Sequence, residues 1–277
     1  MNKKTCYLAF FFLTLLALNA CKEELNEIDY NPNVLSSKDY IRGEDAVLEI
    51  FNAFFKGLND TLVINHGYGY IDACDVTYYE DESKMTFGYG PYNRMCQDGK
   101  FRRGMFYADF TGEIFIEGVT AHIATDSLFV DDQEVQVSID MENLGLSPGN
   151  LPEYSFRVIS AVVSLPDTRR VRLVSFTTDF KLTWTQGSTT PSIHEDNIFM
   201  ITGSSSGVSS YEYAFIVEVK EPLENYLDCF WVSEGISNIT VPAAKIPGGE
   251  IDYISEDGCF NEIHFIFNEN LFFDFLK

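Results

Sequence analysis

The pattern of apolar positions changes character near residue 60. Between Glu44 and Leu58, apolar residues recur at spacings of three and four, which places them on one face of a helix. Asn59 and Asp60 are expected to end this helix. The apolar residues are Val47, Ile50, Phe51, Phe54, Phe55 and Leu58. This pattern predicts a short amphipathic helix whose apolar face packs against another element.

Beyond residue 60, short β-branched and aromatic runs alternate with Gly, Asn, Asp and Pro. Such runs are typical of antiparallel strands joined by tight turns, and the lack of intervening helices argues against parallel βαβ units. We therefore expect an all-β fold of antiparallel strands, in a sandwich or an extended meander, with one short N-terminal helix. The predicted strands are 75–79, 84–89, 103–110, 112–123, 135–141, 154–164, 170–184, 196–202, 211–219, 231–241, 249–254 and 262–268.

The first twenty residues have the pattern of a secretory signal peptide. Two lysines precede an apolar run over residues 7–17, and small residues follow before Cys21. The run is shorter than the roughly 18–20 residues that a membrane-spanning helix needs. Its ending, Leu-Asn-Ala-Cys over residues 18–21, resembles the lipobox of bacterial lipoproteins. That resemblance implies cleavage before Cys21 and lipid attachment to its sulfur.

Four segments follow from these patterns. They are a signal peptide (1–20), a flexible polar tether (21–40), a helix with a first β half (41–147) and a second β half (148–277). Two prolines and two glycines within 144–152 mark the boundary between the halves. In each half one cysteine begins a strand and a second lies in a turn segment that precedes another strand, so we expect two related halves packed as one unit.

The acidic composition restricts the partners of the chain. Forty-two Asp and Glu residues against 19 Lys and Arg residues give a net charge of −23, and loss of the two signal-peptide lysines changes it to −25. Such a charge disfavours nucleic acids and anionic membrane surfaces as partners. The chain nevertheless has enough aromatic and aliphatic residues to form a core.

Besides the signal-peptide cysteine and Cys21, the chain has Cys74, Cys96, Cys229 and Cys259. In an exported protein this even number favours disulfides, and four cysteines allow three pairings. Their local order favours Cys74–Cys96 and Cys229–Cys259. A zinc site and free buried thiols are the alternatives, although no pair has the Cys-x-x-Cys spacing.

Motifs for catalysis are weak. Residues 203–207 match Gly-x-Ser-x-Gly, but a Ser/Gly-rich loop between strands explains them, and only His264 follows them as a possible base. The carboxylates are too numerous to single out a glycosidase pair. We therefore expect no enzyme, no cofactor and no metal. The histidines, none at metal-ligand spacing, are His66, His122, His194 and His264.

Tyrosines are concentrated in the first half of the chain. On an exposed sheet face they can stack on sugars or peptide partners, with their hydroxyls as polar contacts. The alternative is that they only cover the pleated sheet as residues of high β propensity. They are Tyr68, Tyr70, Tyr78, Tyr79, Tyr89, Tyr92 and Tyr107.

Several segments, taken in their order along the chain, resemble uncharacterised Bacteroidetes outer-membrane lipoproteins. The segments are 45–59, 96–104, 181–187, 228–231 and 249–261. The resemblance implies an exported, β-rich lipoprotein of the outer membrane with no known activity. The family usually carries a longer glycine-rich run before the cysteine of the last segment, which this chain lacks.

Two shorter resemblances concern export and modification. The acidic residues 22–27 resemble the signal that carries many Bacteroidetes lipoproteins to the cell surface. Asp60-Thr61-Leu62 and Asp126-Ser127-Leu128 resemble the tripeptide at which these bacteria attach O-glycans, so Thr61 and Ser127 are candidate sites.

Together these expectations describe a lipid-anchored protein of the outer membrane, exposed at the cell surface, that acts as a non-enzymatic scaffold or binding protein. The alternative is a carbohydrate-binding or carbohydrate-active surface protein. The expected partners are the membrane, through the lipid anchor, and a glycan or a protein; nucleic acid is not among them.

Overall fold

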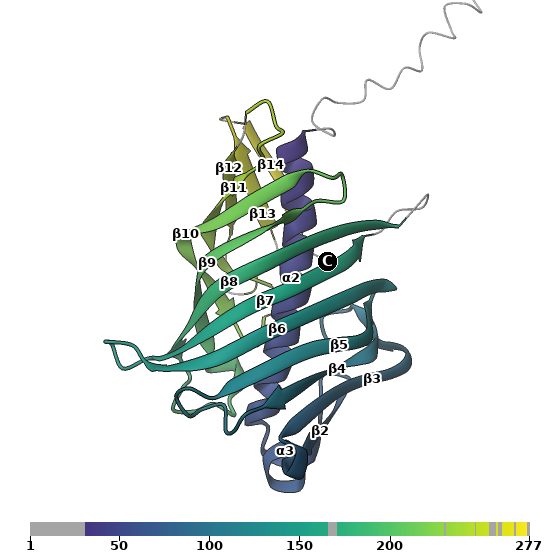
Figure 1. Ribbon diagram of the computed structural model, residues 1–277, viewed down its shortest axis with the longest axis vertical. Coiled ribbons are helices and arrows are strands. Elements are labelled where there is room, and N and C mark those ends of the chain that lie inside the picture. Colours follow the sequence, from purple (N-terminus) through teal and green to yellow (C-terminus); the bar gives the residue numbers. More distant parts are fainter. Residues whose placement is uncertain are drawn as a thin grey trace, which may run out of the picture. The chain divides into compact units, whose positions relative to one another are not determined.

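A computed structural model describes residues 31–165, 171–229, 231–246, 248–254, 259, 262–268 and 270–275 (Figure 1). In these residues a long helix, α2 (Pro32–Asn59), and a short one, α3 (Thr61–His66), precede fourteen strands. The strands are β1 (Tyr68–Ile71), β2 (Cys74–Tyr79), β3 (Lys84–Met95), β4 (Phe101–Phe110), β5 (Thr120–Val130), β6 (Gln133–Leu146), β7 (Pro152–Leu165), β8 (Arg172–Gln186), β9 (Ile198–Val208), β10 (Ala214–Tyr226), β11 (Glu234–Thr240), β12 (Gly249–Tyr253), β13 (Glu262–Phe267) and β14 (Asn270–Phe275).

All fourteen strands belong to one open antiparallel sheet. Their order in the sheet is their order in the chain, so each strand pairs with its sequence neighbours. This confirms the predicted class, mostly antiparallel β with a helix near the N-terminus. Each of the twelve predicted strands overlaps an observed one, whereas the two border strands, β1 and β14, were not predicted. No helix among the described residues is both long enough and apolar enough to cross a membrane.

The helix is much longer than predicted. It has 28 residues and begins at Pro32, so the prediction of a short helix is wrong, and residues 32–40 are helical instead of part of a tether. The N-terminal half escaped the pattern because several of its buried residues are polar. Asn33, Ser36, Ser37, Asp39 and Glu44 are all buried.

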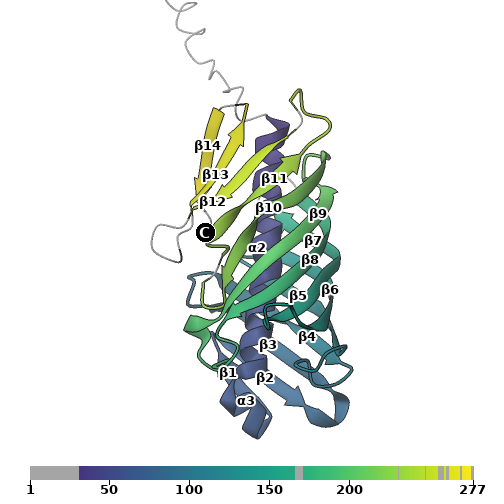
Figure 2. The same ribbon diagram turned by 90° about the vertical axis from the view of Figure 1, so that its left-hand side faces the viewer.

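The sheet curves around α2, as Figures 1 and 2 show. Aromatic side chains from many strands contact the helix: Tyr40 lies against Phe176 and Phe215, and Phe51 lies against Phe156 and Phe199. Because α2 is covered on several sides, its residues form the middle of the hydrophobic core. The helix thus occupies the concave side of the sheet.

Two glycines allow the helix backbone to approach the sheet closely. A Cβ atom at Gly57 would lie 2.6 Å from the Phe87 ring, and one at Gly43 would collide with the Phe176 ring. Side chains at these positions would separate the helix from β3 and β8.

The predicted strand 112–123 is only partly correct. Residues 111–119 form a loop, and the strand begins at Thr120. Asn143 holds this loop by donating a hydrogen bond from Nδ2 to the carbonyl oxygen of Ile114, 2.9 Å away. This buried hydrogen bond satisfies a loop carbonyl group that no neighbouring strand pairs with.

Candidate functional site

The border strand β1 presents two tyrosines to solvent. Asp72 and Ala73, with φ of 42° and 62°, form the two-residue turn that joins β1 to β2. The turn sets the register that places Tyr68 opposite Thr77 and Tyr70 opposite Asp75. Residues two apart in a strand share a face, and both tyrosine side chains lie on the exposed one, 67% and 63% exposed.

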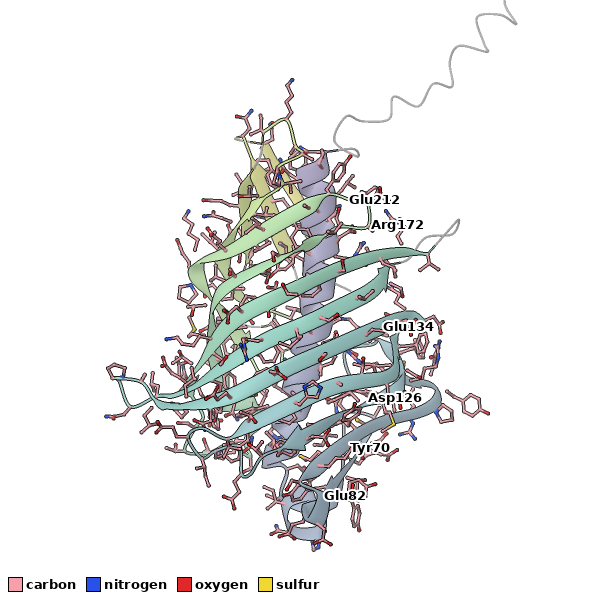
Figure 3. The ribbon with its side chains drawn as sticks, in the orientation of Figure 1. Tyr70, Glu82, Asp126, Glu134, Arg172 and Glu212 are labelled. Carbon is pink, nitrogen blue, oxygen red and sulfur yellow. A yellow bond between two sulfur atoms is a disulfide. The ribbon has the colours of Figure 1, made fainter. Side chains whose placement is uncertain are left out.

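An ion pair lies beside these tyrosines. Arg94 Nη1 donates to Asp75 Oδ2 at 2.8 Å and to the carbonyl oxygen of Ala73 at 3.2 Å. Its guanidinium lies over Gly90, whose φ of 80° bends β3 at this point. Tyr70, labelled in Figure 3, also interacts electrostatically with Arg94. We call Tyr68, Tyr70, Asp75 and Arg94 the aromatic surface.

The other tyrosines are divided between the two sides of the sheet. Tyr92, in the bulge of β3 next to Arg94, is 82% exposed, and Tyr79 is also exposed. Tyr89 is buried, and Tyr107 is partly buried beneath Lys84, whose Nζ lies 4.5 Å from the ring centroid. The seven tyrosines are therefore divided between exposed positions and buried or partly buried ones.

A buried ion cluster joins α2 to β4 and to the turn before β4, on the inner side of the sheet. Lys100 Nζ contacts Asp45 Oδ2 at 2.7 Å and also Glu49. Arg102 Nη2 contacts Glu49 Oε2 and Asp98 Oδ2, each at 2.5 Å. These five residues are the ion cluster, and because all are nearly inaccessible, their charges are screened little by solvent.

The two helix acids of the ion cluster have opposite pKa shifts. Burial raises the pKa of Asp45 to about 7, against the attraction of Lys100. Its Oδ1 has no hydrogen-bond partner among the described residues. Burial also opposes ionisation of Glu49, but the charges of Lys100 and Arg102 outweigh it and hold the pKa at about 2.

Replacing Asp45 with asparagine is expected to flatten the pH dependence of stability between about pH 4 and 7. Because its pKa is raised on folding, the folded chain binds more protons than the unfolded chain in this window, so ionisation of Asp45 costs stability as the pH rises. As the pH rises from 5 to 7.5, the free energy of unfolding of the asparagine variant, taken relative to that of the wild type, should therefore rise by about 1–3 kcal/mol. Urea unfolding at each pH measures this difference.

The exposed carboxylate Asp126 provides the control for this measurement. Asp126→Asn should follow the wild-type pH dependence. Equal slopes for Asp45→Asn and the wild type would show that Asp45 does not titrate in this window.

A small cavity lies beside the ion cluster. Its volume is about 40 Å³, and its lining includes Glu49, Cys74, Tyr89, Arg102 and Cys229. A cavity of this size holds a few water molecules, whereas small-molecule sites usually span roughly 300–1,000 Å³. It is therefore unsuited to a sugar or a lipid.

Only one of the two predicted disulfides is present among the described cysteines. Cys229 and Cys259 are joined, with Cα atoms 5.4 Å apart, which confirms that pair. Cys74 and Cys96 are free and buried, contrary to the prediction of a bond between them. Each thiol instead lies 3.8 Å from a carbonyl oxygen, of Asp75 and of Arg94 respectively. Burial raises the pKa of Cys74 to about 12, which makes it a poor nucleophile.

The candidate motifs for catalysis and metal binding are dispersed. Residues 203–207 lie within β9, paired on both sides, and not on the strand-to-helix turn of a nucleophile elbow. His122 contacts Asp140 at 2.8 Å, and His264 contacts Glu262 at 2.6 Å. The described residues contain no group of three His, Cys, Asp or Glu side chains arranged to hold a metal.

The candidate modification sites have different surroundings. Thr61 and Ser127 are both exposed. Asp60, however, caps α3 by accepting hydrogen bonds from the backbone N–H groups of Leu62 and Val63. Helix capping alone therefore explains an aspartate before Thr61. Cys21 lies outside the described residues.

Sequence reasoning missed the ion cluster. Its two helix acids, Asp45 and Glu49, are more than 50 residues from Lys100 and Arg102, so no local pattern connects α2 to these bases. One signal was available: three of the 19 basic residues of a strongly acidic chain fall within positions 100–103.

Comparison with protein-family models, curated proteins and solved structures finds no match to this chain. The resemblance to Bacteroidetes lipoproteins therefore stays a prediction.

Proposed function

We propose that the protein is a non-enzymatic lipoprotein, held at the outer membrane by lipid on Cys21 and exposed at the cell surface, which binds a glycan through the aromatic surface. In this proposal the sheet is an extended meander that curves around α2 and acts as a rigid support. The observation that carries the proposal is the pair of exposed tyrosines, Tyr68 and Tyr70, beside the Asp75–Arg94 ion pair.

The chemistry of this surface suits a sugar. Aromatic rings offer flat apolar faces on which the C–H side of a sugar ring can stack, and phenol hydroxyls supply polar contacts. The carboxylate of Asp75 accepts hydrogen bonds and the guanidinium of Arg94 donates them, which matches the hydroxyls of a sugar. Because α2 occupies the concave side of the sheet, an external surface is the better place for a large ligand.

The location of the aromatic surface supports the same function. A helix of 28 residues spans about 42 Å. Lipid on Cys21 would join the chain near Pro32, whereas β1 and α3 lie at the other end of α2 (Figure 2). The aromatic surface would then be held away from the membrane, where a polymer outside the cell can reach it.

The test is a glycan array probed with the mature chain lacking only its lipidated cysteine, residues 22–277. Wild-type protein should bind at micromolar concentrations, and a variant with Tyr68→Ala and Tyr70→Ala should bind about tenfold more weakly or worse, since each aromatic contact contributes on the order of 1 kcal/mol. Tyr211→Ala, which alters an exposed tyrosine in the β9–β10 turn, is the matched control and should bind normally. A blank array, or equal binding by the double variant, would refute glycan binding.

A protein partner is the second candidate, because the backbone of β1 is open on one side. Ile71 and Cys74 flank the two-residue turn as a hydrogen-bonded pair, so Tyr68 and Tyr70 direct their N–H and C=O groups away from β2. No described strand pairs with that side. An extended segment of another protein can add to such an edge. Crosslinking on intact cells that captures one partner at β1, together with a blank array, would favour this candidate.

A further inference from the structure

Three parts of the chain meet at the N-terminal end of α2. Asn33 Nδ2 donates to the carbonyl oxygen of Ile246 at 2.8 Å, which holds the β11–β12 connection against the first turn of the helix. Asp39 Oδ2 accepts a hydrogen bond from the backbone N–H of Ser210 at 2.8 Å, which holds the β9–β10 turn there. Two connections that are distant in sequence are thus fixed at the same end of the sheet.

Exposed apolar side chains gather at this end. Val171 is 75% exposed, and Tyr211 and Ile246 are also exposed. On the outer face, Leu173 and Val208 are exposed on neighbouring strands, since Ser175, two residues after Leu173, pairs with Val208. Exposed apolar side chains gathered in one region are typical of interaction sites.

Basic residues accompany the apolar ones. Arg42 and Lys245 are exposed, and the Arg172 guanidinium lies 4.6 Å from the Tyr211 ring. Figure 3 shows Arg172 beside Glu212, the exposed acid of this turn, near the N-terminal end of α2. Asp39, in the first turns of α2, is buried and interacts electrostatically with Arg42 and Arg172. Three basic side chains therefore lie at this end, although the net charge of the whole chain disfavours anionic membranes.

The length of chain before α2 limits how far this end can be from a lipid anchor. Residues 22–31 separate Cys21 from Pro32. Ten residues span at most about 35 Å when fully extended. If Cys21 carries lipid, as the proposed function holds, the N-terminal end of α2 stays within that distance of the membrane.

We propose that this end of the sheet is a membrane-binding surface, which we call the base. It consists of Val171, Leu173, Val208, Tyr211 and Ile246, with Arg42, Arg172 and Lys245 among them. Its occupant is a lipid leaflet with anionic headgroups: the apolar side chains enter the headgroup region, and the basic side chains bind lipid phosphates.

This inference rests on the proposed anchor and adds an orientation to it. A tether alone would leave the protein free to tumble above the membrane. With the base on the leaflet, α2 points away from the membrane and the aromatic surface faces outward. Binding by the base thus fixes which end of the sheet is presented to a ligand.

Fluorescence quenching in vesicles tests the proposal. Lipidated Tyr211→Trp protein is reconstituted into vesicles of phosphatidylcholine with about 30% phosphatidylglycerol, with and without brominated lipid, and wild-type emission is subtracted to remove the two native tryptophans. Tyr211→Trp should lose about half of its added emission, because the base enters roughly 5–10 Å into the headgroup boundary. Tyr92→Trp, at an exposed tyrosine of β3, is the matched control and should not be quenched.

A charge-reversal variant adds an independent readout. Arg42→Glu with Lys245→Glu, combined with Tyr211→Trp, should restore most of the lost emission while the thermal melting temperature stays unchanged, because both residues are exposed. Hydrogen exchange of wild-type protein should be slower over residues 208–213 and 241–246 in vesicles than in detergent.

The outcomes separate the base from the anchor. Protein that fails to float with the vesicles and carries no lipid by mass spectrometry would contradict the proposed anchor. Protein that floats with them but shows neither quenching nor protection would overturn the base and leave the anchor intact. Equal quenching of the two tryptophan variants would also overturn it. So would a dimer in sedimentation that the charge-reversal variant dissociates, because this end would then be an interface between two copies.

Discussion

Replacing Phe55 with alanine is expected to lower the free energy of unfolding by about 3–5 kcal/mol. The Phe55 ring is fully buried, and its centroid lies 4.8 Å from that of Phe199 and 5.0 Å from that of Trp184. The rings of Tyr154 and Phe115 are each 6.1 Å away. Because these neighbours belong to separate strands and a loop, each held by its own backbone pairing, they do not move together to fill the cavity that the alanine would leave.

Urea unfolding followed by far-ultraviolet circular dichroism measures this loss. Leu62→Ala, which shortens an exposed apolar side chain on α3, is the control and should change stability by less than about 0.5 kcal/mol. A loss below about 1 kcal/mol for Phe55→Ala would show that the sheet does not depend on packing against this part of α2.

Replacing Arg102 with methionine is expected to cost a similar amount, about 3–5 kcal/mol, for a different reason. Methionine preserves much of the side-chain volume, so little cavity is formed. The loss arises because Glu49 and Asp98 would keep their negative charges inside the protein without the guanidinium that binds both. Removing one partner of a buried ion pair lowers the free energy of unfolding by more than the intact pair contributes to it, because the remaining charge is left buried without a counter-charge.

The adjacent residue provides a matched control. Arg103 pairs with Asp132, an exposed residue of the β5–β6 turn, and its guanidinium lies 4.0 Å from the Phe129 ring centroid. Arg103→Met should therefore cost less than about 1 kcal/mol in the same urea experiment. Equal losses for the two variants would refute the distinction between the buried and the exposed pair.

The strands were predictable because their signal is local. Alternation of apolar and polar residues within one strand already reports which face is buried, and β7 (Pro152–Leu165) and β8 (Arg172–Gln186) match their predicted ranges closely. The local order of the cysteines predicted Cys229–Cys259, which is present, and also Cys74–Cys96, which is not. Both predictions depend on residues near one another in the chain.

The missing parts depend on distant contacts. Asn33 Nδ2 donates to the carbonyl oxygen of Ile246, and Asp39 accepts a hydrogen bond from the backbone N–H of Ser210. Polar residues satisfied in this way read as solvent-exposed in a hydrophobic pattern, so the first half of α2 resembled a tether. The aromatic surface depends likewise on the bend at Gly90, which no spacing rule reveals.

The place of α2 in the chain has a consequence for how the protein is made. The helix is synthesised before every strand that covers it, yet the Tyr253 hydroxyl that binds its Glu44 comes 209 residues later. Hairpins between neighbouring strands can form as they emerge, since their contacts are local. The helix can be fully enclosed only after β12 has been synthesised, so the closing of the sheet over α2 comes late in folding.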